Sequence, residues 1–209
     1  HLACADEPAE TREQVKLFEE ATVRLAKVGI APPMRHAANS AAVLGGDALF
    51  DAVRPGVAIF GVSPLSRELP DLKAAMLVRS EIIDLRTIED REPVGYGALF
   101  RAKRRTRIAT LPMGYADGLS RQLSNRGHVL VRGVRAPIVG AVSMDMSMID
   151  VTDVAGVALR DEVVVLGTQE GVLGKETICA EEIAGHAGTI AWEVLTSISR
   201  RVPRFYREP

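Results

Sequence analysis

The sequence predicts a parallel α/β unit followed by a mostly β domain. Residues 1–65 alternate between helical and strand-like patterns, which is typical of a parallel α/β unit. After Pro70 the chain becomes a series of short β-rich runs separated by glycine, proline and aspartate. We find no repeat and no low-complexity segment. We therefore expect one domain over residues 1–70 and a second, β-rich domain with a terminal helical segment over residues 71–209.

Length and composition agree with this division. The chain has 209 residues, of which 47% are hydrophobic and 25% charged, enough apolar surface for one or two cores. A net charge of −1 gives no indication of a nucleic-acid partner. No apolar run approaches the roughly 18 residues that a membrane span needs. The two cysteines, Cys4 and Cys179, lie in no metal-ligand spacing, so we expect free thiols in a reducing, cytoplasmic environment and no metal.

The first residues, "HLACADEPAE", have no initiator methionine and no secretory pattern. "HLACAD" is typical of the end of a strand that leads into a helix. We therefore expect the chain to begin within a fold, as the C-terminal portion of a longer protein.

Helices and strands of the α/β unit follow from spacing. Apolar positions at helical spacing predict a helix over residues 11–28, which Gly29 ends. A short strand then ends near Ala38 or Asn39, where Asn39 or Ser40 caps the next helix. "FDAVRPGVAIFGVSP" predicts another strand, bounded by proline and glycine.

In the β-rich region, "AAMLVRSEIIDLRTI" is strand-like and "PVGYGALF" supplies a turn. Further strands are predicted in "TRIATLPMG", "HVLVRGVRAPIVGAVS", "MSMIDVTDV" and "DEVVVLGTQ". A helix is expected from Thr177 to Gly185, and "IAWEVLTSISRRVPRFY" predicts a final helix with an extension.

Two segments of the α/β unit could bind an anion together. "HAANSA" ends a strand in Asn-Ser before a helix and so offers a hydroxyl and backbone N–H groups. A simple helix cap with an internally hydrogen-bonded histidine explains the same residues. In "VRPGVAIFG", Arg54 needs a partner if it is buried, and Gly56 allows close backbone approach. If this unit is a barrel, Ser40 and the Gly56 and Val57 amides converge on one phosphate.

Three further stretches are less specific. "RAKRRTR" has no interleaved aromatic residues, which favours a solvated face over a nucleic-acid site. "GYADG" places Tyr115 on a glycine-hinged turn at the exit of a strand. In "GAVSMDMSMID", spacing alone favours a core methionine at Met144 and an aspartate in a turn.

Taken together and in order, seven stretches resemble the C-terminal part of an alanine racemase. They are "HLACADE", "HAANSAA", "VRPGVAIFG", "PVGYG", "GYADG", "SNRGHVLVRGVRAPIVGAVSMDM" and "TIAWEVLTSISRRVPRFY". They span essentially the whole chain, and the ordered set is specific where any one member is weak.

The resemblance implies the C-terminal part of a (β/α)₈ barrel that binds pyridoxal 5'-phosphate, followed by a β domain. It implies a bacterial homodimer with shared active sites that interconverts L- and D-alanine, supplying D-alanine for peptidoglycan. Two bases act on opposite faces of the substrate carbon in that family. Tyr115 matches one of them and is expected to reach the partner subunit's cofactor.

The remaining site residues are carried over by motif. Ser40, Gly56 and Val57 match phosphate contacts, and Arg54 matches the arginine that faces the pyridine nitrogen. Met144 matches a position whose backbone N–H holds the substrate carboxylate. His1 matches a histidine that supports the arginine. Because arginine stays protonated, the ring nitrogen that it faces is expected to stay unprotonated.

The chain departs from the family pattern at two important places. The family's Schiff-base lysine lies in a motif that this chain lacks, and its own lysines, at positions 16, 27, 73, 103 and 175, lie in other contexts. The chain alone is therefore expected to be inactive. Trp192 replaces a tyrosine that donates to the phosphate. An indole N–H can donate but points differently, so at this cofactor-binding position we expect ring packing at the site entrance.

Other functions remain open from sequence alone. A broad-specificity amino-acid racemase of the same fold would carry the same motifs. An amino-acid decarboxylase of this architecture ranks low, because it normally presents an acidic group where this chain has Arg54. A non-catalytic module derived from the fold is a different class of protein. Retention of Tyr115, Arg54 and Ser40 argues against it.

Overall fold

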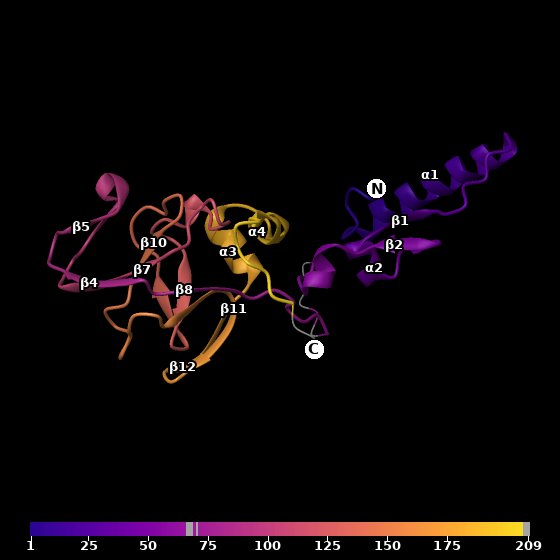
Figure 1. Cartoon of the computed structure of the whole chain (residues 1–209). Helices are drawn as coiled ribbons and strands as arrows, with labels where there is room; N and C mark the ends of the chain where they lie inside the picture. The colour runs from indigo at the N-terminus through magenta and orange to yellow at the C-terminus, as the bar shows by residue number, and fades with distance from the viewer. Residues whose placement is uncertain (66–68, 70, 207–209) are drawn as a thin grey trace. The chain divides into compact units, whose positions relative to one another are not determined.

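The computed structural model describes residues 1–65, 69 and 71–206 and consists of two compact units, His1–Ala75 and Met76–Pro209 (Figure 1). The expected domain boundary at Pro70 lies outside the described residues. Within them, no helix is long and apolar enough to cross a membrane.

The first unit alternates helix and strand. Its elements are α1 (Pro8–Lys27), β1 (His36–Asn39), α2 (Ser40–Gly45), β2 (Ala52–Arg54) and the 3-10 turn η1 (Val57–Phe60). Strands β1 and β2 are parallel. The predicted cap is present, because the Asn39 side chain accepts a hydrogen bond from the Ala42 N–H. The α/β pattern of this unit agrees with the sequence.

The strand predicted over residues 50–64 is much shorter in the structure. Only Ala52–Arg54 forms a strand, and the chain then turns into η1. Pro55 has no N–H to donate to a ladder, which ends the strand there. This early turn brings Gly56 back over the start of α2.

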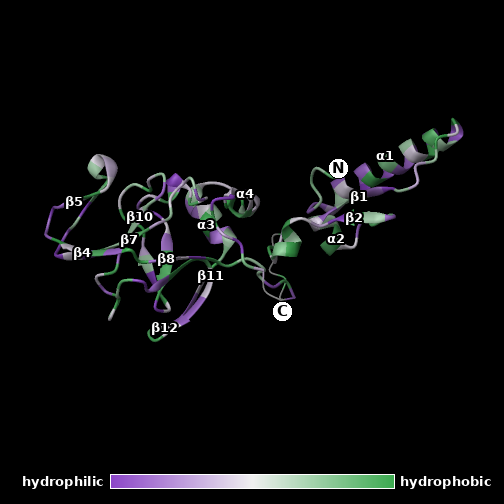
Figure 2. Cartoon of the chain, viewed as in Figure 1, coloured by the Kyte–Doolittle hydropathy of each residue, from purple (hydrophilic) through white to green (hydrophobic). Residues whose placement is uncertain are grey.

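Much of the apolar surface of α1 is exposed. Only Thr11 of this helix is buried, whereas Leu17 and Val23 are 58% and 55% exposed. Figure 2 shows hydrophobic and hydrophilic residues mixed along the helix. The small buried cluster of this unit is Leu2, Ala38 and Ala42.

The second unit is built mainly from antiparallel strands (Figure 1). One sheet has the order β10-β7-β4, with β4 (Asp84–Ile88), β7 (Thr106–Leu111) and β10 (Ser147–Asp150). A second sheet contains β3 (Val78–Glu81), β8 (His128–Val131), β9 (Val134–Pro137), β11 (Glu162–Gly171) and β12 (Gly174–Ile178). A short hairpin pairs β5 (Pro93–Val94) with β6 (Phe100–Arg101). The helical segments are η2 (Tyr96–Ala98), η3 (Arg121–Leu123), α3 (Ala180–Ala187) and α4 (Ala191–Ser197).

The sequence predicts a helix from Thr177 to Gly185, and this predicted start is too early. Thr177 belongs to β12, where it pairs with Thr168 of β11. The helix begins at Ala180 and ends before Gly188, whose φ is 70°. The final helix ends at Ser197, because Ile198 has the extended ψ of 109°, and the predicted extension follows it.

A histidine pair joins α3 to β8. The rings of His128 and His186 are 6.0 Å apart. Burial lowers the pKa of His128, and the nearby charges of His186 and Arg135 lower it further, while Glu182 opposes them. Arg135 is itself paired with Glu176 and Glu182. A proton on His128 is therefore disfavoured in the folded state.

This pair predicts a loss of stability in mild acid. When the folded pKa of a histidine lies below its unfolded value, stability is complete above the unfolded value of about 6.5 and falls as pH drops below it. We expect His128→Gln to reduce the fall in melting temperature between about pH 7 and pH 5. Thermal unfolding of both chains by circular dichroism tests this. Identical pH dependence in the two chains would contradict it.

Candidate functional site

The end of β1 and the turn after β2 form a small donor cradle in the first unit. The Ser40 hydroxyl oxygen accepts hydrogen bonds from the Gly56 N–H at 2.8 Å and the Ala58 N–H at 3.3 Å. Ser40 is buried, and it opens α2 directly after the Asn39 cap. A Cβ added at Gly56 would meet no atom within 4 Å, so the backbone there is open to a ligand. The structure therefore brings Ser40 against the backbone of Gly56 and Ala58. Val57 lies between them in sequence and is buried, and its contact with a phosphate stays a prediction.

Arg54 is held beside this cradle by three groups. Its Nη1 contacts Nδ1 of His36, and its Nη2 lies 3.2 Å from both Nδ1 of His1 and the carbonyl oxygen of Ala37. Because a guanidinium can only donate, each of these imidazole nitrogens accepts, and the ring proton lies on Nε2. The need of Arg54 for partners is thus met. His36, which a simple structural role could explain, proves to be one of them.

These residues fit a phosphate ester. Where the parallel strands end, the Gly56 and Ala58 N–H groups hold the Ser40 hydroxyl oxygen, which leaves the hydroxyl proton to donate to an anion. The fixed cation of Arg54 lies next to them. No histidine, cysteine or carboxylate cluster of three or more members in the described part of the chain could bind a metal ion.

Tyr115 lies on a turn that follows β7 in the second unit. The turn is bonded to the segment before β10: Tyr115 N–H donates to the Ser143 carbonyl at 3.0 Å, and Ala116 N–H donates to the Met144 carbonyl at 2.9 Å. A Cβ on Gly114 would lie 2.3 Å from the Ser143 oxygen, so glycine permits this contact. The structure therefore places Tyr115 next to Met144.

Met144 is not a core methionine, which corrects the expectation from spacing. Its residue surface is 55% exposed, because it sits on the loop that the Tyr115 turn contacts. Tyr115 is 46% exposed. Both are thus accessible, unlike the apolar residues of β7 beneath them.

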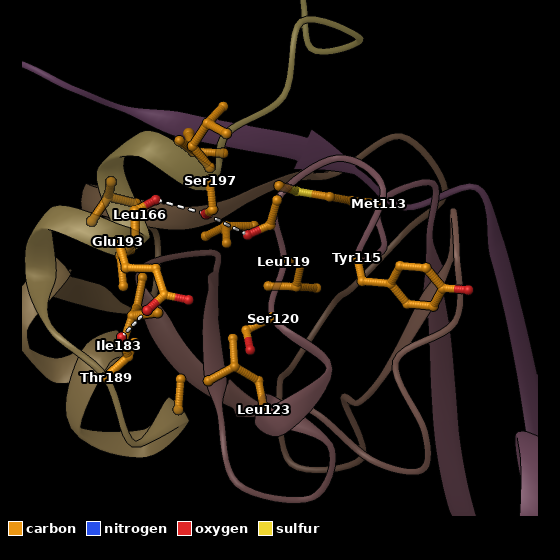
Figure 3. A pocket seen from close by; sticks show the side chains of 16 residues that line it. Met113, Tyr115, Leu119, Ser120, Leu123, Leu166, Ile183, Thr189, Glu193 and Ser197 are labelled. Carbon is orange, nitrogen blue, oxygen red and sulfur yellow. Dashed lines mark hydrogen bonds between the residues drawn. The ribbon is translucent and has the colours of Figure 1, made fainter.

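A cavity of about 170 Å³ lies beneath the turn, between it and the helices α3 and α4. Its walls are mostly apolar, with Glu193 as the charged member, hydrogen-bonded by the Thr189 hydroxyl. Figure 3 shows the Tyr115 ring directed away from the other labelled side chains. The turn thus forms one wall of the cavity, and the phenol of Tyr115 points away from the other side chains.

Trp192 does not join either group of residues. It lies on α4, is 43% exposed, and is absent from the cavity wall. Its packing at the entrance of a cofactor site stays a prediction.

Asp117 is the functional candidate that motif reasoning left without a role. It is only 8% exposed, and its carboxylate accepts a hydrogen bond from the Gly114 N–H at 2.9 Å. An aspartate followed by glycine in a turn was the available signal, but its burial could not be read from the sequence.

Comparison with known proteins extends over both units. The family model "Alanine racemase, N-terminal domain" matches residues 1–64, and "Alanine racemase, C-terminal domain" matches residues 75–206. An alanine racemase of Sorangium cellulosum is 64% identical over 100% of this chain and 56% of its own length. An alanine racemase structure from Streptomyces coelicolor A3(2) superposes with a TM-score of 0.88 at 37% identity, over 99% of this chain and 54% of that one.

A structure of alanine racemase from Bartonella henselae "with covalently bound pyridoxal phosphate" has a TM-score of 0.84 at 35% identity. The match covers 99% of this chain and 55% of the Bartonella henselae chain. The chain therefore spans about half the length of the relatives it matches.

Proposed function

Because the chain belongs to the alanine racemase family, we propose that it is part of an enzyme that interconverts L- and D-alanine with pyridoxal 5'-phosphate. The observation that carries the proposal is the Tyr115 turn, bonded to the Met144 loop so that the phenol of Tyr115 and the Met144 segment lie together on an accessible surface. A two-base reaction needs a proton carrier beside a group that holds the substrate. We propose that Tyr115 is the proton carrier and that the Met144 segment holds the substrate.

The cofactor is supported by the first unit. Ser40 with the Gly56 and Val57 amides would hold the phosphate, and Arg54, fixed by His36 and His1, would face the pyridine nitrogen. When bound, pyridoxal phosphate supplies an electron sink that acidifies the substrate Cα–H. We expect the ring of Trp192 to pack at the entrance of the cofactor site. The named Bartonella henselae relative supports the same choice of cofactor.

Tyr115 would move the proton on one face of the substrate carbon, while the Met144 N–H would donate to the substrate carboxylate. A phenol titrates near pH 10, so it needs cationic neighbours to act as a base. The opposite base would be the Schiff-base lysine, which we place in the part of the relatives' length that this chain does not span.

The complete enzyme is proposed to be a cytoplasmic homodimer with shared sites that supplies D-alanine for peptidoglycan. Met144 and Met146, at 55% and 44% exposure, offer apolar surface around Tyr115 for a second copy to cover. Cys4 and Cys179 are both free thiols, which suits a reducing compartment. The domain assignment within it is proposed as barrel for residues 1–70 and β domain for residues 71–209.

The test restores the missing length. We expect the 209-residue chain alone, with added pyridoxal phosphate, to show no racemisation of alanine by chiral chromatography. The same chain joined to the upstream part of the Sorangium cellulosum relative is expected to racemise alanine. Serine serves as a second substrate to measure breadth. Racemisation by the isolated chain would contradict the need for residues outside it, and an inactive, folded fusion would contradict the function.

A further inference from the structure

The Tyr115 turn is bonded on a second side, away from the Met144 loop. The end of α4 and the segment that follows it contact the turn: the Ser199 N–H donates to the Asp117 carbonyl at 3.1 Å, and the Ser197 hydroxyl donates to the Gly118 carbonyl at 3.1 Å. A Cβ on Gly118 would lie 2.7 Å from Cα of Ile198, so the two backbones are in direct contact. The turn is thus fixed between two segments that are distant in sequence.

Asp117 is the residue where these contacts meet. One carboxylate oxygen, Oδ2, accepts from the Gly114 N–H and closes the turn around Tyr115. The other, Oδ1, lies 3.3 Å from Nε of Arg201, which follows α4. Its carbonyl accepts from Ser199. A single side chain therefore ties the turn to itself and to the C-terminal segment.

Burial makes the two carboxylate contacts matter. The Asp117 side chain is 11% exposed, and a carboxylate withdrawn from water is costly without a partner. Arg201 supplies the balancing charge and is itself 55% exposed, so it bears little desolvation cost. Removal of the Asp117 carboxylate leaves the Gly114 N–H without its acceptor, and removal of the Arg201 guanidinium leaves the buried Asp117 charge unpaired.

The phenol of Tyr115 has no such support of its own. It projects outward from the turn, and no hydrogen bond from its hydroxyl joins it to another described residue (Figure 3). Its position is therefore set by the backbone of the turn. A base must lie within hydrogen-bond reach of the proton it removes, and a shift of about 1 Å can cost about 100-fold in rate.

We propose that Asp117, held by Arg201, is the positioning residue that sets the place of Tyr115 for proton transfer. This inference rests on the proposed racemase function. The C-terminal segment after α4 then contributes to catalysis through the turn, without touching the substrate.

The experiment compares four forms of the fused, full-length protein: unchanged, Asp117→Asn, Arg201→Lys and Arg79→Gln. Arg201→Lys keeps the charge beside Asp117. Arg79→Gln is the matched control, because it removes a partly exposed pair between Arg79 of β3 and Glu162 of β11, neither of which lines the cavity beneath the turn. Hydrogen exchange of the Tyr115 and Ala116 amides is measured by mass spectrometry, together with kcat and KM for alanine.

For Asp117→Asn we expect exchange of these two amides to be about tenfold faster, with kcat about 100-fold lower and KM within about twofold. Arg201→Lys should keep most of the activity, and Arg79→Gln should change neither readout. Unchanged exchange in Asp117→Asn would overturn the inference, as would faster exchange with an unchanged kcat. An inactive unchanged protein would defeat the proposed function, whereas exchange would still show whether Asp117 holds the turn.

Discussion

Replacement of Tyr115 by phenylalanine is expected to reduce alanine racemisation by about 100-fold to 10,000-fold, the usual contribution of a positioned acid or base. The ring stays in place because the turn, and not the hydroxyl, fixes it. The melting temperature should therefore be unchanged. Tyr206→Phe is the matched control, since Tyr206 is 91% exposed and outside the candidate site.

The decisive measurement is hydrogen exchange at the substrate carbon. L- and D-alanine have equal free energies, so the loss of kcat/KM must be the same in both directions of racemisation. Hydrogen exchange at the substrate carbon that keeps the configuration is not subject to this equilibrium constraint. In deuterated water we expect deuterium to enter one enantiomer through the remaining base, and to be almost absent from the other. Equal loss of wash-in for both enantiomers would contradict the role of Tyr115 on one face.

Local signals in the sequence predicted the contacts around Ser40 in the first unit. Asn39 as a cap and Ser40 at the start of α2 follow from short-range chemistry, because a polar residue after a buried strand has few other roles. Gly56 likewise marked a place where backbone and ligand can approach. The two segments meet because parallel strands end at one edge.

Long-range contacts were beyond such reasoning. The role of Asp117 depends on Arg201, which lies 84 positions further along the chain, at 3.3 Å in space. The exposure of Met144 depends on how its loop meets the Tyr115 turn. Thr177 has neighbours that suit a helix, yet pairing with Thr168 makes it part of a strand. In each case tertiary contact, and not local propensity, decides the outcome.

Gly114→Ala is expected to lower the melting temperature of the second unit by roughly 5–10 °C, for an overpacking cost of about 1–3 kcal/mol. A Cβ at this position would lie 2.3 Å from the Ser143 oxygen and 2.5 Å from the Asp145 nitrogen. Both are backbone atoms, so no side chain can rotate away. The Tyr115 turn and the Met144 loop must separate instead, and racemisation by the fused protein should fall with stability.

Gly185→Ala is the matched control for this substitution. Gly185 lies within α3, and a Cβ there would meet no atom within 4 Å. Alanine in a helix interior is expected to stabilise the chain by about 0.5–1 kcal/mol relative to glycine. Thermal unfolding should thus move the two alanine variants in opposite directions. A Gly114→Ala chain as stable as the unchanged one would show that the two loops can part at no cost. The close contact between Gly114 and the Ser143 carbonyl would then not be what holds the Tyr115 turn in place.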